Sequence, residues 1–493
     1  MTPVDLMYLI NDIVWGPPII ILLLGTGLAL SIYTAFVQIR RFRTAWMTFV
    51  RYRGYGGERG ISPFAIWCAV SGATIGVGNI AGVSTAIYWG GPGALFWMFI
   101  TGILGMVTKA FEATLSVWAR RITPTGEIEG GTPYYIRLIP VVGPALAILF
   151  SVFAWIAAFG IGNMVQANNV ALGAQWIAAA FMGRPALPEE LKPIVNLVAG
   201  VIIMILVALV VIGGLKRIAE LSSFLVPFMA LWYIVGGLIL WIANPRYFAW
   251  AIVEIIRGAF LPEALVGGVA GWTLLSAIRW GVARGLFSNE AGLGSAPNMY
   301  AYMKVDHPGR VGMYGMIEVF VDTPVVCMVT GLTNVTMLLK TYEVYGYTYN
   351  DVIIKGVMSG GEPLKGAKMA MWAFSQFYGI WAGVVVGVAL FLFALTTLLS
   401  WEWYGEVNFV YFFSRTLKLP EKPVRWFWRV LWVIPIIPAA YYGEEAFKLF
   451  WDFADTMNGL MAIPNLIAIG VLAPVAYKLI HDFTERYVKT VGV

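Results

Sequence analysis

Residues 71–82 read SGATIGVGNIAG, and this stretch lies inside a long apolar run. Four of its residues are glycine, and Thr74 and Asn79 are polar. A helix in lipid satisfies its own backbone hydrogen bonds, and unwound backbone is tolerated only where it lines a protein cavity. The glycines also form two small-xxx-small pairs, which are typical of close helix packing. Thr74 and Asn79 favour the other interpretation, a helix that is broken at mid-depth in a membrane.

The composition around this stretch is that of a membrane protein. Of the 493 residues, 59% are apolar and 12% are charged, and that charged fraction is about half that of a soluble domain. We therefore predict an all-α polytopic protein embedded in a lipid bilayer. Eleven apolar runs approach the roughly 20 residues that cross the hydrocarbon core. With approximate ends, they cover 13–37, 62–89, 94–119, 143–171, 194–213, 221–243, 264–288, 312–338, 374–401, 425–442 and 460–479.

The basic residues indicate the orientation of these spans. Six arginines lie between residues 40 and 59, directly after the first run, and such clusters are typical of cytoplasmic loops. Eleven spans then place the N-terminus outside and the C-terminus in the cytoplasm of a multi-pass plasma-membrane protein. This topology explains the net charge of +6, so we expect no nucleic-acid partner. Cys68 and Cys327 lie in apolar runs and predict neither a disulfide framework nor a metal cluster.

A second glycine-rich stretch, LVGGVAGWT at residues 265–273, opens the seventh run. Setting residues 1–38 apart as an extra N-terminal span leaves two sets of five runs, in residues 39–243 and 244–493. Because five is odd, the second set is inverted relative to the first. Each set then opens with a glycine-rich run. Paired broken helices in an inverted repeat mark the substrate site of many secondary transporters, although close packing explains the second stretch equally well.

Longer motifs resemble one protein family. They read GVGNIAGV at 76–83, GGPGALFWM at 90–98, GNMVQAN at 162–168 and GVARGLFSNEAGLGSAP at 281–297. These motifs are similar to those of the alanine or glycine:cation symporters, and with the number of spans the resemblance covers nearly all of the chain. It implies a leucine-transporter-type fold and sodium-driven uptake of alanine or glycine.

A shorter similarity connects the chain to the sodium-coupled neurotransmitter-type symporters of that fold. Their first broken helix carries GNAVGLGN, where this chain has GATIGVGN at 72–79. Their eighth core helix carries AGLTS, where this chain has FALTT at 393–397. Each match is short, but the two helices flank the same ion site in those proteins. The resemblance therefore implies that Na⁺ is the coupling ion.

Sodium is a hard cation that prefers oxygen ligands. We expect the ion to be bound by backbone carbonyls and threonine hydroxyls of these two helices. An alternative for the threonines is a hydrogen bond to the carbonyl four residues earlier in the same helix. The expected ligands are the carbonyls of Gly72, Ile75 and Phe393 and the hydroxyls of Thr396 and Thr397. A second sodium near the Thr74 carbonyl and Asn79 is a further hypothesis.

A zwitterionic substrate needs partners for both of its charged ends. The N-terminus of a half-helix offers N–H donors and a positive field to a carboxylate, and we expect this half-helix to begin near Val77. The ammonium group requires acceptor oxygens, and bulky side chains are needed to restrict a pocket to a small substrate. The candidate substrate-binding residues are Thr74, Gly76, Val77, Gly78, Asn79, Gln166, Gly268, Gly271, Trp272 and Trp372. For Gln166, a hydrogen bond between packed helices is the alternative.

Charged residues inside the spans need partners, because isolated charges are costly there. Lys109 and Glu112 are three residues apart, which is a spacing that allows pairing on one helix face. Glu318 and Asp322 are four apart, and we leave open whether they handle ions or protons or form a structural salt bridge. The segment 288–297 follows the seventh run, so we expect it to shape an inner gate without contacting substrate. Within it, Glu290 is a candidate partner for Arg284.

The function that these features predict is secondary active transport: sodium-coupled symport of alanine or glycine into the cell by alternating access. A proton-coupled or uncoupled permease of the same fold is the alternative, and an ion channel is less favoured because no filter loop is evident. No enzymatic activity is expected, since no metal cluster or nucleophile–base pair appears at membrane depth. Nothing in the sequence indicates an obligate protein partner.

Overall fold

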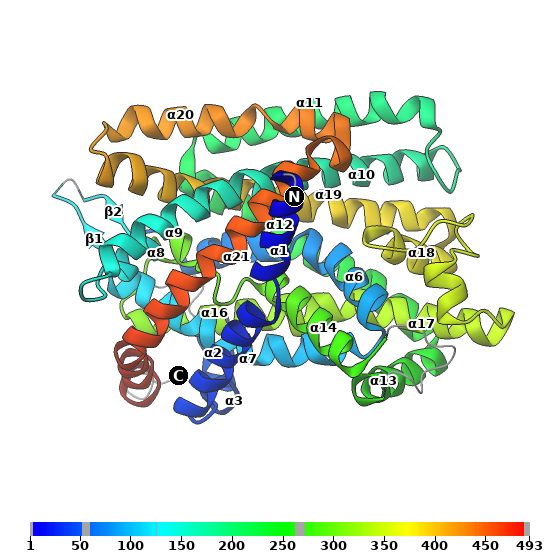
Figure 1. Ribbon diagram of the computed structural model, residues 1–493, viewed down its shortest axis with the longest axis horizontal. Coiled ribbons are helices and arrows are strands. Elements are labelled where there is room, and N and C mark those ends of the chain that lie inside the picture. The colour runs from blue at the N-terminus through cyan, green and yellow to red at the C-terminus, as the bar shows by residue number, and fades with distance from the viewer. Residues whose placement is uncertain (1–2, 52–59, 125, 262–271, 488–493) are drawn as a thin grey trace.

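The computed structural model describes residues 3–51, 60–124, 126–261 and 272–487, and their regular structure is almost entirely helical (Figure 1). Two short strands form an antiparallel hairpin after α7: β1 (Arg121–Ile122) and β2 (Ile128–Glu129). The prediction of a polytopic helical protein is therefore confirmed at the level of fold class.

The N-terminal run is divided into two helices. Gly16 is extended, and Pro17 and Pro18 lack backbone N–H groups, so the chain turns there instead of continuing one helix. The first helix packs against α21 and the second against α7. Their bounds, with those of the two helices that follow, are α1 (Pro3–Val14), α2 (Pro17–Tyr33), α3 (Val37–Arg40) and α4 (Phe42–Arg51).

The first set of expected spans forms a series of helices with one broken member. That member is α5, η1 and α6, and its two parts meet at an angle of 56°. The bounds are α5 (Pro63–Thr74), η1 (Val77–Asn79), α6 (Ala81–Gly90), α7 (Ala94–Trp118), α8 (Thr132–Ile136), α9 (Gly143–Ala157), η2 (Ala158–Met164), α10 (Val165–Phe181), η3 (Glu189–Leu191), α11 (Lys192–Val211) and α12 (Gly214–Ala243).

Helix α12 ends at Ala243 and α13 begins at Pro245, and the division of the chain at residues 243 and 244 stays a prediction. The inverted repeat itself stays a prediction. The bounds are α13 (Pro245–Phe260), α14 (Leu274–Asn289), α15 (Pro297–Tyr300), α16 (Pro308–Phe320), η5 (Val321–Cys327), α17 (Met328–Tyr345), η6 (Asn350–Ile354), α18 (Ala367–Tyr378), η7 (Gly379–Trp381), α19 (Ala382–Val410), η8 (Tyr411–Thr416), α20 (Glu421–Val433), α21 (Ile436–Asp482) and η9 (Phe483–Tyr487).

In the described residues, seven helical segments are long and apolar enough to cross a membrane, and the bent pair α5–α6 makes an eighth. Three expected spans hold shorter helices: α2 has 17 residues, α14 has 16 and α20 has 13. The count of eleven therefore stays a prediction. The seven segments are Ala94–Trp118, Gly143–Phe181, Glu189–Val211, Gly214–Ala243, Pro308–Tyr345, Ala367–Thr416 and Ala446–Glu485.

The broken helix lies among the most buried elements of the bundle. Its first part, α5, packs against α12 and α19, and its second part, α6, packs against α14. Helix α7 packs against both α14 and α16. Glycines allow some of these close approaches: a Cβ on Gly281 would lie 2.2 Å from the carbonyl oxygen of Ala94. The fold thus brings 71–82 of one half and 281–297 of the other together.

Candidate functional site

The first break lies where the glycine pattern predicts it. Helix α5 ends at Thr74, and the backbone is not helical again until Val77 begins a single 3₁₀ turn. The amide N–H of Gly76 donates to Asn79 Oδ1 at 2.8 Å, which closes the turn. As the first residues of that turn, Val77 and Gly78 have N–H groups that the turn cannot satisfy by itself. The expectation of a broken helix in this run is confirmed.

A second interruption of regular backbone follows α14, while the break expected at 265–273 stays a prediction. Gly268 and Gly271, with the rest of 262–271, lie outside the described residues. The described helix α14 then continues without interruption to Asn289, and regular backbone stops at Glu290. Glu290, Gly292 and Gly294 have positive φ angles of 54°, 92° and 82°. For Gly292 and Gly294 this conformation favours glycine, since the residue lacks a Cβ.

Segment 288–297 follows the end of α14 as expected, but it is buried inside the bundle; its role as an inner gate stays a prediction. Ser288, Asn289 and Glu290 are buried, with exposed fractions of 2%, 0% and 4%. The burial was not expected because a run of polar residues has the hydropathy of a loop. In the fold these polar groups are satisfied by partners from distant helices, which makes burial tolerable.

Glu112 on α7 holds this second break in place. Its Oε1 accepts hydrogen bonds from the backbone N–H groups of Gly292 and Gly294, both at 3.1 Å, and from Asn465 Nδ2 at 2.6 Å. The expected pairing of Glu112 with Lys109 is thus replaced. Lys109 instead pairs with Glu318 of α16, with 3.6 Å between Nζ and Oε2. Pairing across helices binds the two carboxylates to different partners, which spacing along one helix does not reveal.

A small chamber of about 20 Å³ lies between the two breaks. It is lined from five parts of the chain, and five of the candidate substrate residues, Thr74, Gly76, Val77, Gly78 and Gln166, are among them. The other lining residues are Ala73, Ile161, Phe287, Glu290, Leu293, Thr397, Trp401 and Asn458. We call this space the central chamber.

Several polar groups of the central chamber are available to a ligand. Gln166 Nε2 donates to the carbonyl oxygen of Ile161 at 3.1 Å. Among the described residues, Gln166 Oε1 and Asn458 Oδ1 are buried without any hydrogen-bond partner. Glu290 accepts from Trp401 Nε1 at 3.0 Å and from the Ser295 hydroxyl. Two amide oxygens and a carboxylate thus line the same chamber as Val77 and Gly78 of the first break.

Other candidate substrate residues lie away from the chamber. Asn79 is fully buried, and its side chain is committed to Gly76 and, through Nδ2 at 2.8 Å, to Asp322 Oδ1. Trp272 donates to the Tyr88 carbonyl at 3.1 Å and packs on the ring of Tyr349. Trp272 and Trp372 are both buried in one apolar cluster, which does not include the residues that line the chamber. The bulky walls of the chamber are Phe287 and Trp401 instead, so the expectation for Trp272 and Trp372 does not fit the geometry.

The candidate sodium ligands come together around one hydroxyl. Thr397 Oγ1 lies 3.1 Å from the Gly72 carbonyl oxygen, 3.3 Å from that of Ala73 and 2.9 Å from that of Phe393. Ile75 lies in the same break, with its N–H donating to the Ser71 carbonyl at 2.7 Å. The Thr396 hydroxyl differs, since it bonds to the carbonyls of Leu392 and Phe393 within its own helix.

Asp322 occupies a second polar centre next to Asn79. Its carboxylate accepts hydrogen bonds from the hydroxyls of Ser288 and Thr323, at 3.0 Å and 2.6 Å to Oδ2, besides the bond from Asn79. The residue therefore connects η5 to both broken helices. Glu318, one turn earlier, is the partner of Lys109, so the two carboxylates whose roles the sequence left open have separate environments.

A larger cavity of about 510 Å³ adjoins the central chamber, with Val77, Gly78 and Phe287 lining both spaces. Its lining includes Lys365, which precedes α18, and Lys368, which lies in the first turn of α18. Arg284 also lines it and does not pair with Glu290 in the described structure; its guanidinium lies 5.4 Å from the ring centre of Trp280. The larger cavity offers a way into the chamber past Phe287.

Sequence reasoning missed Phe287, Glu290, Trp401 and Asn458 as chamber residues. Two of them lie in the 281–297 motif, where Gly292 and Gly294 closely follow the polar residues Ser288, Asn289 and Glu290. This mixture of glycine and polar residues resembles the pattern that identified the first break. Trp401 is four residues after Thr397, so both occupy one face of α19. Asn458 carries no comparable signal in the sequence.

A broken helix, a second break beside it and a buried chamber between them are the features of a membrane transporter. The chain belongs to the sodium:alanine symporter family, whose sequence profile matches residues 2–491. Its relatives and structural neighbours are transporters, not enzymes.

Individual comparisons agree with this family. The chain is 38% identical over 487 residues to the sodium/alanine symporter AgcS of Methanococcus maripaludis, covering 98% of this chain and 97% of the relative. It is 34% identical to the putative sodium/proton-dependent alanine carrier protein YrbD of Bacillus subtilis, with 98% and 93% covered. Among solved structures, MhsT in complex with L-phenylalanine has a TM-score of 0.56 at 16% identity, covering 86% of this chain and 99% of that one. That similarity supports the leucine-transporter-type fold.

Proposed function

We propose that this chain transports alanine or glycine together with sodium into the cell across the plasma membrane, with its N-terminus outside and its C-terminus in the cytoplasm. The observation that carries the proposal is the central chamber, which is lined by Val77 and Gly78 at the start of the 3₁₀ turn and by Gln166 and Asn458, whose amide oxygens have no hydrogen-bond partner among the described residues. Such an arrangement suits a zwitterion, because each charged end needs partners of the opposite character once water is removed.

The substrate carboxylate is assigned to the N–H groups of Val77 and Gly78, where the half-helix that continues into α6 begins. A helix N-terminus attracts anions through its free donors and its dipole. A Cβ built on Gly78 would be in van der Waals contact with Ser288 Cα at 3.5 Å and Phe287 Cδ1 at 3.6 Å, so a larger side chain there would press on both residues. Thr74 and Gly76 complete this side of the pocket.

The substrate ammonium is assigned to Gln166 Oε1 and Asn458 Oδ1, with the Glu290 carboxylate beside them. Two of these acceptors lack a hydrogen-bond partner among the described residues, and an unpaired buried acceptor is costly unless a ligand satisfies it. Phe287 and Trp401 form bulky walls, which supports a substrate with a small side chain.

The coupling sodium is assigned to the oxygen atoms around Thr397. The Thr397 hydroxyl, with the carbonyls of Gly72 and Phe393, supplies hard oxygen ligands from two helices. Ile75 and Thr396 remain proposed ligands that would have to complete the shell. Binding there would fix α19 against the first break and so favour the conformation that holds substrate.

Proton coupling is the second candidate. Four buried carboxylates, Glu112, Glu290, Glu318 and Asp322, lie near the chamber, and one relative is named a sodium/proton-dependent alanine carrier. Buried acids in membrane proteins often serve proton transfer. Sodium has the stronger support, since the Thr397 oxygens match the residues that the resemblance implied.

Uptake by purified protein in proteoliposomes tests the proposal. Labelled alanine and labelled glycine are offered with an inward gradient of sodium, of potassium, or of protons in sodium-free buffer, and empty liposomes are the control. Accumulation is expected only with sodium. Accumulation driven by the proton gradient alone would replace sodium with protons, and equilibration without any gradient dependence would indicate an uncoupled permease or a channel.

A further inference from the structure

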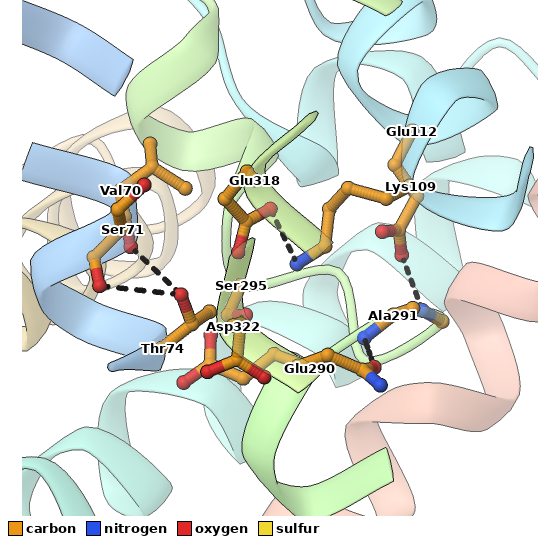
Figure 2. A network of polar contacts seen from close by, with 12 residues as sticks. Val70, Ser71, Thr74, Lys109, Glu112, Glu290, Ala291, Ser295, Glu318 and Asp322 are labelled. Carbon is orange, nitrogen blue, oxygen red and sulfur yellow. Dashed lines mark hydrogen bonds and ion pairs between the residues drawn. The ribbon is translucent and has the colours of Figure 1, made fainter. Parts of the chain in front are cut away.

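A fully buried ion pair lies behind the central chamber. Lys109 on α7 and Glu318 on α16 both have side chains with 0% exposure, and Nζ lies 3.6 Å from Oε2 (Figure 2). That distance exceeds a direct hydrogen bond, and Lys109 Nζ has no hydrogen-bond partner among the described residues. The proposed transport function assigns no role to this pair.

Small residues allow the pair to form inside the bundle. A Cβ on Gly315 would lie 3.1 Å from the carbonyl oxygen of Lys109 and 3.2 Å from its Cγ, and one on Gly312 would lie 2.5 Å from Thr114 Oγ1. Helices α7 and α16 are therefore in close contact at the position of Lys109, where its side chain extends from α7. The ammonium is directed into the interior and not toward lipid or a headgroup.

The pair connects the two breaks. Glu318 lies beside the side chain of Thr74, the last residue of α5 (Figure 2). One helical turn from Lys109, Glu112 binds the N–H groups of Gly292 and Gly294 in the second break. Helix α7 thus carries, three residues apart, the cation next to one break and the anion that shapes the other.

The charges around Lys109 are unbalanced. Its ammonium experiences the fields of four carboxylates, Glu318, Glu112, Glu290 and Asp322. Within the described part of the chain, Lys109 is the one cation that acts on Glu318. A carboxylate deep in a protein needs a cation or a proton beside it. Without the ammonium, Glu318 would have to take one from solution.

We propose that the Lys109 ammonium is a resident cation that takes the place of a second transported ion between the two broken helices. It neutralises Glu318 in every transport cycle without entering or leaving, so one sodium at the Thr397 oxygens accompanies each substrate molecule. This inference rests on the proposed sodium-coupled function. It also predicts the stoichiometry of transport. A second sodium bound beside Glu318 would be transported with the substrate, whereas the Lys109 ammonium is part of the chain and stays in place.

The first test measures the unaltered protein. In proteoliposomes, the membrane potential at which net alanine flux reverses is recorded at fixed sodium and alanine gradients. One sodium per alanine is expected, and two would overturn the proposal. Flux with no dependence on sodium would instead refute the proposed function, so the two failures are distinguishable.

The second test removes the resident charge. Alanine binding is titrated with sodium for Lys109→Gln, and for the double variant Lys109→Gln/Glu318→Gln, at several pH values. The single variant is expected to bind alanine with a steeper sodium dependence, or to regain binding as the pH falls, because Glu318 now recruits sodium or a proton. The double variant is expected to return to the slope of the unaltered protein, since the carboxylate has gone with the ammonium.

Lys109→Arg, which keeps the charge, is the matched control and should keep the original slope. The other titratable groups facing the pair are Glu112, Glu290 and Asp322 and the hydroxyls of Tyr300 and Tyr404. They are common to the single and double variants, so a difference between those variants reports on Glu318. An unchanged sodium slope and pH profile in Lys109→Gln, or the same change in both variants, would reduce the pair to a structural contact. If Lys109→Gln does not fold, the reversal potential still decides.

Discussion

The Thr397 hydroxyl on α19 lies 3.1 Å from the carbonyl oxygen of Gly72 on α5, although 325 residues separate the two in the sequence. The contact depends on glycine nearby: a Cβ on Gly76 would lie 2.6 Å from Thr397 Oγ1. Because α19 contacts α5 at the first break, an ion bound by these oxygens would hold the two helices together. In the proposed alternating-access cycle, these helices would move relative to each other.

Replacing Thr397 with alanine is expected to raise the sodium concentration needed for alanine binding. The loss of one neutral oxygen ligand corresponds to about 0.5–1.5 kcal/mol, or roughly a twofold to tenfold higher sodium midpoint. At saturating sodium, alanine affinity should largely recover, since substrate binding is affected only through coupling. The measurement is alanine binding titrated across sodium concentrations.

Thr396→Ala is the matched control for that experiment. Its hydroxyl bonds within α19 to Leu392 and Phe393, so a smaller shift of the sodium midpoint is expected. An unshifted midpoint in Thr397→Ala would remove the sodium assignment. A larger shift in Thr396→Ala would mean that the Thr396 hydroxyl rotates to bind the ion.

Gly78→Val is expected to abolish alanine binding at every sodium concentration. The valine methyl groups would extend into the central chamber and cover the N–H groups assigned to the substrate carboxylate, and no amount of sodium relieves a steric block. Gly470→Ala is the control, because a Cβ there meets nothing within 4 Å. Rescue of Gly78→Val by excess sodium would contradict the assignment of the first break to substrate.

Glu290→Gln is expected to weaken alanine binding even at saturating sodium. The variant keeps an acceptor for Trp401 and a polar partner for Ser295, so its main loss is the negative charge beside the substrate ammonium. A hydrogen bond to a charged group contributes about 1.5–3 kcal/mol, or roughly a tenfold to hundredfold change in affinity. Equilibrium binding of labelled alanine measures it.

Two comparisons sharpen the Glu290 result. Glu220→Gln alters a carboxylate whose side chain is 61% exposed and should leave binding unchanged. If Glu290→Gln slowed turnover but kept alanine affinity, Glu290 would act in gating, as the sequence alone suggested for this segment.

Cysteine labelling tests the predicted orientation of the spans. Thr2 and Thr490 lie outside the described residues, so Lys355 and Lys216 are better positions, with side chains that are 60% and 80% exposed. An impermeant thiol reagent applied to intact cells should modify Lys355→Cys and spare Lys216→Cys. The native thiols of Cys68 and Cys327 are buried. Modification of both new cysteines from outside would show that the span count is wrong between them.

Much of the site was predictable because it lies in continuous motifs. Residues 72–79 combine glycines with two polar side chains in an apolar run. That local pattern predicts a break in the helix without any information about the neighbouring helices. The same stretch supplies Gly76, Val77 and Gly78 to the chamber. Gln166 and Thr397 were also identified, because a polar side chain in a membrane span is costly when it faces lipid and is therefore expected to face the protein interior.

The remainder depended on contacts that no local pattern contains. The second break at 290–296 resembled a loop in hydropathy, and hydrogen bonds with Glu112, Asn465, Trp401 and Thr132, all distant in the sequence, make its burial tolerable. Likewise, Lys109 and Glu112 have a spacing suited to pairing on one helix, yet each finds a partner on another element. Trp401, and not Trp272 or Trp372, walls the chamber because α19 crosses the first break there.

The sequence by itself determined that this is a helical membrane protein with a broken helix at residues 71–82, since apolar content, glycine spacing and motif similarity are properties of the chain read in order. The tertiary structure alone decided which polar groups meet. Hydrogen bonds and ion pairs act over a few ångströms in space, so the partners of Glu112, Glu290, Glu318 and Thr397 were settled only when helices hundreds of residues apart packed together.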